Sequence, residues 1–287
     1  MEERFQKLRN MELFTEELFN RIFAFQEKQS AAWDDSKSFD ERIKGIPLHN
    51  LIFSNPDRDP ETTGPTIAHY YPLREENRAL AYYARQVSEH PTVLDVHARN
   101  GFVGSLLARE GLKVIGLRDP AEKPSQIADF YDPAHYELRT GGLGDVDFDV
   151  DVAFCSWMPA GRNVTPEIVA LRPKMIIYIY TEHINEHTKE RQTGTDEAFD
   201  KLPSNYRIVD EWEIMRPENM LQEAWPDLSA SIEEKRIVRI YADESVADIP
   251  QYAIEEMATP YDWEEDLELA LLAIEAKAHL RSRGIAV

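Results

Sequence analysis

The sequence predicts an α/β fold built on one mostly parallel sheet of seven strands with an antiparallel end. Between residues 91 and 180, short apolar runs alternate with helical segments, an order typical of a parallel sheet covered by helices. The runs 151–157 and 175–180 are apolar almost throughout, as expected of central strands covered on both faces. The strands 207–215 and 235–242 alternate apolar and polar residues, which places them together at a wetter, antiparallel end.

The elements before the sheet are expected to be helical. Apolar residues at helical spacing predict an amphipathic helix over 2–30. Three prolines, a glycine and several turn-forming residues in FSNPDRDPETTGP indicate a surface loop within 31–66. A second helix runs from Leu73 to Ser88, and it ends before Pro91 because the residue preceding a proline is biased away from the helical conformation.

The later helices have local start and stop signals. The helix from Phe102 to Glu110 has Gly111 where a C-terminal cap belongs. Thr165 is expected to cap a helix whose first residue is Pro166, since proline suits that position. An apolar stripe predicts a last helix over 262–282. The remaining predicted elements are the strands 92–96, 113–117 and 135–139 and a short helix over 197–202.

The balance of charged side chains narrows the class of partner. The chain of 287 residues has 53 acidic and 32 basic side chains, so its formal net charge is −21. Nucleic acids and anionic membranes are bound through basic surfaces, so we expect a small-molecule partner instead. No apolar run reaches the ~20 residues of a membrane span, and the charged start MEERFQKLRN is unlike a secretory signal. We therefore expect a cytoplasmic protein; its oligomeric state, with a homodimer as one option, stays open.

The loop after the first strand contains the leading candidate site. In an open α/β sheet, ligands bind beyond the carboxyl ends of the strands. The segment LDVHARNGFVG (94–104) joins a strand to a helix through a tight turn with a glycine, which is the general form of a loop that cradles a nucleotide. Asp95 lies at the end of the strand and Gly101 precedes the helix, so both are candidate cofactor-binding residues.

At this loop the sequence resembles the class I S-adenosylmethionine-dependent methyltransferases, which share a Rossmann-like sandwich. Their first motif reads roughly (V/L)LD(V/I)GxGxG, and VLDVHARNG lies on it without a gap. VIGLRDP resembles their second motif, DVAFCSWMP resembles the motif of their fourth strand, and the order and spacing of the seven strands match as well. The resemblance covers about residues 68–243. It implies a helical extension and loop over 1–66, a methyltransferase-like domain over 67–243, and a C-terminal helical tail over 244–287 that packs on the same domain.

The chain departs from the family pattern at three cofactor motifs. His97 and Arg99 replace the first two glycines of the loop, and the resemblance implies that their side chains crowd the methionine end of the cofactor. Arg118 stands where the family has an acid that holds the ribose hydroxyls, with Asp119 one residue later. Gly142 stands where the family has an acid that contacts the adenine. All five residues are candidate cofactor contacts through this resemblance.

Candidates for the acceptor side follow the later strands. Ser156 and Trp157 end the fourth strand, where the family places its methyl acceptor, and Ser156 is also a candidate cofactor contact. Trp157 can stack on an adenine or a flat substrate, or simply pack in the core. His183, beside Glu182, can act as a general base or a metal ligand, or belong to a solvated loop; no recognised metal-ligand spacing is present. Tyr71 lies in a segment that often closes over the cofactor in the resembling family.

Two functions stay open on these residues. The resemblance implies an enzyme that transfers a methyl group from S-adenosylmethionine to a small molecule, a reaction that depends mainly on alignment of donor and acceptor. The altered motif positions instead favour a protein that keeps the fold, has lost S-adenosylmethionine binding, and serves as a ligand-binding or assembly module. A nicotinamide-dependent dehydrogenase fits less well, because Gly101 and Gly104 supply only the end of its GxGxxG pattern.

Overall fold

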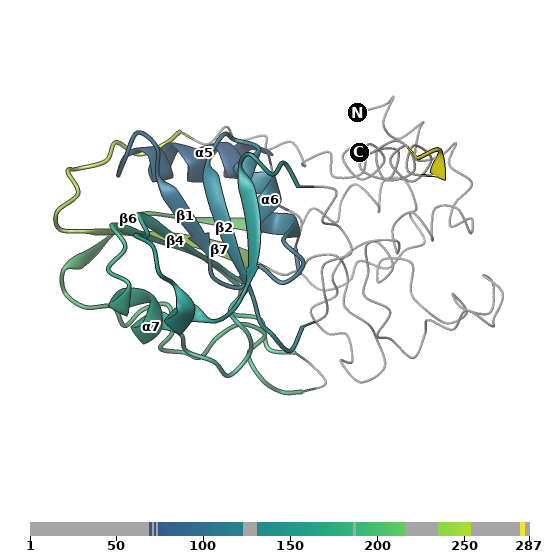
Figure 1. Cartoon of the computed structure of the whole chain (residues 1–287). Helices are drawn as coiled ribbons and strands as arrows, with labels where there is room; N and C mark the ends of the chain where they lie inside the picture. Colours follow the sequence, from purple (N-terminus) through teal and green to yellow (C-terminus); the bar gives the residue numbers. More distant parts are fainter. Residues whose placement is uncertain are drawn as a thin grey trace, which may run out of the picture.

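One seven-stranded sheet organises the described part of the chain (Figure 1). The computed structural model describes residues 69, 70, 72, 74–122, 131–185, 188–215, 235–253 and 282–284. The predicted helix over 2–30, the predicted loop over 31–66 and nearly all of the predicted helix over 262–282 lie outside the described residues. Tyr71, a candidate cofactor contact, also lies outside them.

The sheet has the order β3-β2-β1-β4-β5-β7-β6. Its parallel strands are β1 (Thr92–Asp95), β2 (Lys113–Arg118), β3 (Tyr136–Thr140), β4 (Val152–Ser156) and β5 (Met175–Tyr180). β7 (Lys235–Asp243) pairs antiparallel with β5 on one side and with the edge strand β6 (Tyr206–Met215) on the other. The predicted fold class, including its antiparallel end, is confirmed. The strand order reverses between β1 and β4, and ligands bind at such a reversal, beyond the carboxyl ends of the strands.

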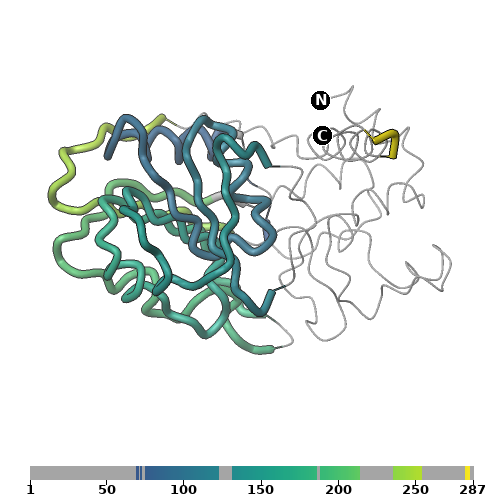
Figure 2. Tube along the Cα trace, in the orientation of Figure 1, coloured from purple at the N-terminus to yellow at the C-terminus, as the bar shows by residue number. Residues whose placement is uncertain are grey.

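Helices cover both faces of the sheet, which explains why its central strands are apolar throughout. α5 (Arg74–Arg85) and α6 (Phe102–Ala108) pack on one face, and α7 (Thr165–Ala170) packs on the other (Figure 1). Within β5, Ile177 faces the layer of α5 and α6 whereas Tyr178 faces the layer of α7. Figure 2 traces how the chain returns late in the sequence to place β7 beside β5. No helix among the described residues is long and apolar enough to cross a membrane.

Two local predictions are wrong, and one short element was not predicted. Residues 197–200 form turns, and 201 and 202 have no regular structure, so the predicted helix is absent. The buried Phe199 ring stacks on Tyr180, so packing decides this backbone rather than helix propensity. Thr165 is the first residue of α7 and not its cap, because its hydroxyl group hydrogen-bonds to the Tyr178 hydroxyl at 2.8 Å. The unpredicted element is η2 (Leu143–Asp145), one turn of 3-10 helix after β3.

Candidate functional site

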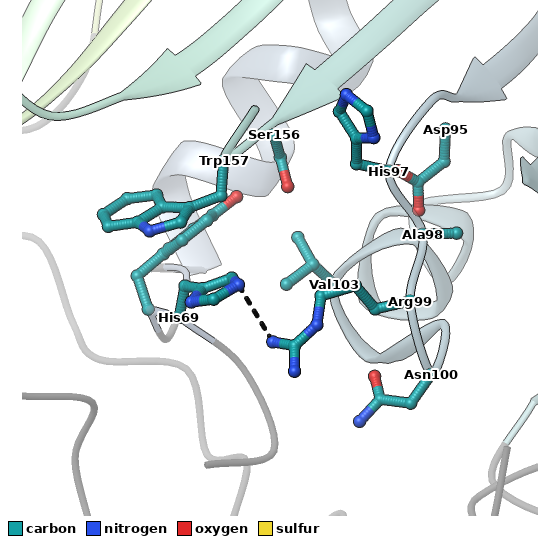
Figure 3. Close-up of a pocket in the computed structure, with 10 residues that line it drawn as sticks. His69, Asp95, His97, Ala98, Arg99, Asn100, Val103, Ser156 and Trp157 are labelled. Atoms are coloured by element: carbon teal, nitrogen blue, oxygen red, sulfur yellow. Dashed lines mark hydrogen bonds between the residues drawn. The ribbon is translucent and has the colours of Figure 1, made fainter. Parts of the chain in front are cut away.

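A pocket opens at the carboxyl ends of β1 and β4, where the strand order reverses (Figure 3). Its walls come from residues 69 and 70, from the loop after β1 and from the end of β4. The pocket itself has a volume of about 20 Å³, and the space out to its open mouth, solvent included, is about 330 Å³. It brings together five of the predicted site residues: Asp95, His97, Arg99, Ser156 and Trp157.

The loop of the pocket has two left-handed residues at the positions of motif glycines. Arg99 has φ +50° and Gly101 has φ +85°. A residue with a Cβ adopts this region at a cost of about 1–2 kcal/mol, so Arg99 holds a glycine-like backbone against its own preference. The Arg99 side chain extends to the mouth of the pocket, toward His69 (Figure 3). The loop therefore keeps the backbone conformation that glycine normally provides, although a long side chain has been added to it.

Asp95 places a buried carboxyl group on the pocket wall. Its side chain is 1% exposed, and neither oxygen atom has a hydrogen-bond partner in the described structure. The carboxyl group lies against Gly104 of α6, at a place where any Cβ would overlap it. Burial disfavours the ionised form and raises the pKa of Asp95 to about 8. Buried polar groups normally have partners, so this carboxyl group is suited to bind a ligand that donates hydrogen bonds to it, above all a cation.

The pKa of Asp95 predicts how stability changes with pH. In the unfolded chain an aspartate ionises near pH 3.9, whereas Asp95 in the folded protein keeps its proton up to about pH 8. The contribution of Asp95 therefore lowers the free energy of unfolding as the pH rises from 4 to 8, by roughly 1 kcal/mol per pH unit. In urea unfolding at pH 5 and pH 8, Asp95→Asn should gain stability relative to wild type at the higher pH. Asp149→Asn, at an exposed position, should show the same change in stability between pH 5 and pH 8 as the wild type. If Asp95→Asn also showed the wild-type change, the raised pKa of the buried carboxyl group would be contradicted.

Two more polar groups of the wall lack partners. The Nε2 atom of His97 and the Nε1 atom of Trp157 are buried and make no hydrogen bond in the described structure. Burial and the nearby Arg162 guanidinium lower the pKa of His97 to about 4, although Asp119 opposes the shift. The His97 imidazole is therefore neutral at neutral pH. Trp157 has φ +55°, an unusual conformation for a bulky residue, and such strained residues concentrate at functional sites.

Aromatic rings and one cation form the mouth of the pocket. The Trp157 ring stacks with His69 at 5.9 Å between centroids and with Tyr70 at 5.2 Å. The Arg99 guanidinium group donates a hydrogen bond to Nε2 of His69 at 3.0 Å (Figure 3). Because a guanidinium group has no acceptor atom, Nε2 of His69 accepts this hydrogen bond with its lone pair, as the neutral form of the ring does. The Arg236 guanidinium group lies 4.5 Å from the centroid of the Tyr70 ring.

The candidate contacts for ribose and adenine lie outside the lining of this pocket. Arg118 donates to the carbonyl oxygen of Glu122 at 2.6 Å and to the hydroxyl group of Thr140 at 2.7 Å. Asp119 is exposed and accepts a hydrogen bond from the backbone N–H two residues later. The N–H of Gly142 donates to the side chain three residues further on. In this structure these groups stabilise the turns that follow β2 and β3.

His183 lies in the loop after β5, apart from the pocket. Its backbone N–H donates to the hydroxyl group of Thr181 at 3.1 Å, and its carbonyl oxygen accepts from Gln192 at 2.9 Å. The neighbouring Glu182 makes an ion pair with Arg191 at 3.5 Å. Within the described ranges, no three His, Cys, Asp or Glu side chains form a group that could hold a metal ion.

Several pocket residues were not predicted, among them His69, Asn100 and Val103. His69 is 30 residues away from Arg99 in the chain, so only the fold brings the two together. Asn100 lies within the motif itself, and its side-chain oxygen accepts the N–H of Phe102 at 3.1 Å, which closes an Asx turn at the start of α6. The sequence Asn-Gly before an apolar run is the available signal for that turn.

The strand order and the pocket at the carboxyl ends of β1 and β4 match the arrangement that the resemblance to the class I methyltransferases implies. No family model matches the chain, and no curated protein matches it. Solved structures do match. A Burkholderia thailandensis 1,6-didemethyltoxoflavin N1-methyltransferase, with S-adenosylhomocysteine bound, is 15% identical, with a TM-score of 0.39 over 59% of this chain and 79% of its own.

Two further solved structures show the same low level of likeness. The magnesium protoporphyrin IX methyltransferase of Synechocystis is 12% identical, with a TM-score of 0.39 over 54% of this chain and 74% of its own. An rRNA methylase from Streptococcus thermophilus is 14% identical, with a TM-score of 0.37 over 59% of this chain and 97% of its own. At these identities and TM-scores, none of the three structures transfers an activity or a substrate to this chain.

Proposed function

We propose that this chain binds S-adenosylmethionine in the pocket between β1 and β4 and transfers its methyl group to a small molecule. The observation that carries the proposal is the buried, unpartnered carboxyl group of Asp95 beside a loop with left-handed residues at two motif positions. The amino-acid end of the cofactor has an ammonium group, which is the kind of donor this carboxyl group lacks. The net charge of −21 supports a small molecule rather than a nucleic acid as acceptor.

The pocket residues fit the amino-acid end of the cofactor and leave polar groups for an acceptor. Asp95 would accept hydrogen bonds from the ammonium group, and the backbone of the loop would lie along the same end. Ser156 and the neutral His97 also line the pocket, where they can hydrogen-bond an acceptor and orient it. When bound, S-adenosylmethionine would supply a methyl carbon for an acceptor lone pair to attack, and the sulfur would leave with the electron pair of the C–S bond.

Calorimetric titration with S-adenosylmethionine and S-adenosylhomocysteine tests the proposal. We expect micromolar dissociation constants, equivalent to about −8 kcal/mol. An ammonium group beside Asp95 would lower the pKa of this residue from about 8, so binding at pH 7 should release a proton and the heat should depend on the buffer. Asp95→Asn should abolish the proton release and weaken binding, whereas the exposed Asp149→Asn should do neither.

A second candidate function is favoured by the arginine side chains at altered motif positions. Arg118 is engaged with Thr140 where the family has a ribose-binding acid, and Arg99 contacts His69 across the pocket mouth. Both contacts favour a protein that keeps the fold without the cofactor and binds another ligand. The same titration separates the two functions. Absence of heat at millimolar cofactor, from protein with an intact unfolding transition, would overturn the enzyme proposal and leave the binding module.

A further inference from the structure

We propose that Arg99 binds the carboxylate of the ligand's amino-acid group and exchanges its hydrogen bond with His69 for that contact. The inference rests on the proposed function, because it assigns one end of the same ligand. Arg99 stands at a position of the loop where glycine is expected, so its side chain is an addition of this chain rather than part of the resemblance.

The geometry at the pocket mouth supports an anion-binding role for Arg99. Its backbone keeps φ +50° despite the Cβ, so the loop has not been rebuilt to remove the side chain from the pocket. Its guanidinium group donates to Nε2 of His69, which is a neutral acceptor. A carboxylate is a stronger acceptor than a neutral imidazole, since it carries a negative charge and can accept two parallel N–H bonds from one guanidinium group. A carboxylate in the mouth can therefore displace the imidazole.

The other polar groups of the pocket complement this assignment. The Asp95 carboxyl group on the wall suits an ammonium group, and Arg99 at the mouth suits a carboxylate. Nε1 of Trp157 is a buried donor without a partner in the described structure, and Trp157 lines the same pocket. The Asp95 carboxyl group can accept hydrogen bonds from an ammonium group, and the Arg99 guanidinium group can donate them to a carboxylate. Together they match a zwitterionic α-amino acid group. His69 stacks on Trp157, so it remains at the edge of the site when Arg99 turns away.

The test compares S-adenosylmethionine with its decarboxylated analogue. We expect wild-type protein to bind the complete cofactor at least 10-fold more tightly, and Arg99→Met to bind both compounds alike. Arg162→Met is the matched control, because it removes the same charge near the pocket from a residue that does not line it. This control should keep the wild-type preference. Unfolding curves of all three proteins establish that each is folded.

Each outcome bears on one of the two proposals. If Arg99→Met or Arg99→Gly binds S-adenosylmethionine as tightly as wild type, Arg99 contributes nothing to binding; if either binds it more tightly, Arg99 obstructs the pocket. In both cases the assignment of Arg99 fails while the proposed function stands. If wild-type protein prefers the decarboxylated analogue, the assignment also fails. If folded wild-type protein binds neither compound, the proposed function itself is overturned.

Discussion

Glu76→Leu is expected to lower the free energy of unfolding by about 3–5 kcal/mol, the cost of leaving a buried charge without its partner. Glu76 in α5 and Arg236 in β7 form a bidentate pair with N–O distances of 2.7 and 3.3 Å. Their side chains are 0% and 5% exposed. The leucine side chain cannot accept the hydrogen bonds of Arg236, so the guanidinium group would stay desolvated. Urea unfolding at neutral pH measures the loss.

Two further variants separate a buried ion pair from a general effect of charge. Replacing both partners, as Glu76→Leu with Arg236→Met, should recover most of the stability, because a buried pair replaced by apolar residues of similar volume is often neutral or stabilising. Lys235, which precedes Arg236 on β7, makes an exposed ion pair with Glu213. Glu213→Leu breaks this pair and should lower the free energy of unfolding by no more than about 1 kcal/mol. Equal losses for Glu76→Leu and Glu213→Leu would contradict the buried pair.

The fold could be predicted because the information for each strand is local. The run MIIYIY has no polar face, and it forms β5 (Met175–Tyr180) with the predicted bounds and both faces covered. The alternating pattern of β6 and β7 likewise predicted the antiparallel end. The prediction over 197–202 failed because the Phe199 ring is fixed by its stacking on Tyr180, a contact that no pattern within those residues contains.

The candidate site was predictable where its residues lie at the end of a predicted strand, as Ser156 and Trp157 do at the end of β4. Asp95, His97 and Arg99 fall in a single motif, and all three line the pocket. The left-handed backbone of Arg99 could not be predicted, since arginine does not favour it. The pair of Glu76 and Arg236 is 160 residues apart, and nothing distinguishes these charges from the 53 acidic and 32 basic side chains of the chain until the fold buries them.

Gly101→Ala adds a single methyl group and should lower the free energy of unfolding by more than most changes of this size. Gly101 has φ +85°, which costs about 1–2 kcal/mol for a residue with a Cβ. The new Cβ would lie 2.5 Å from the Tyr131 hydroxyl oxygen and 2.8 Å from the Tyr136 hydroxyl oxygen. Overpacking of this kind typically costs about 1–3 kcal/mol more. We expect both losses together in urea unfolding.

Two other glycines allow the backbone and packing effects to be separated. Gly161 has φ +69°, and no described atom lies within 4 Å of the position that an added Cβ would take, so Gly161→Ala should show the backbone cost alone. Gly144 lacks the left-handed conformation and also has open space, so Gly144→Ala should be close to neutral. A loss for Gly101→Ala no larger than that for Gly161→Ala would refute the packing contribution.

The same substitution also tests how the loop is held against β3. Because Tyr136 belongs to β3, relief of the overlap at Gly101 requires either the tyrosine or the loop to move. Adding Tyr136→Phe to Gly101→Ala removes one of the two oxygen atoms and should restore part of the lost stability. If the loop moves instead, Arg99 moves with it, and cofactor binding should weaken more than the loss of stability alone explains. Stability that recovers without binding would show that the loop had shifted.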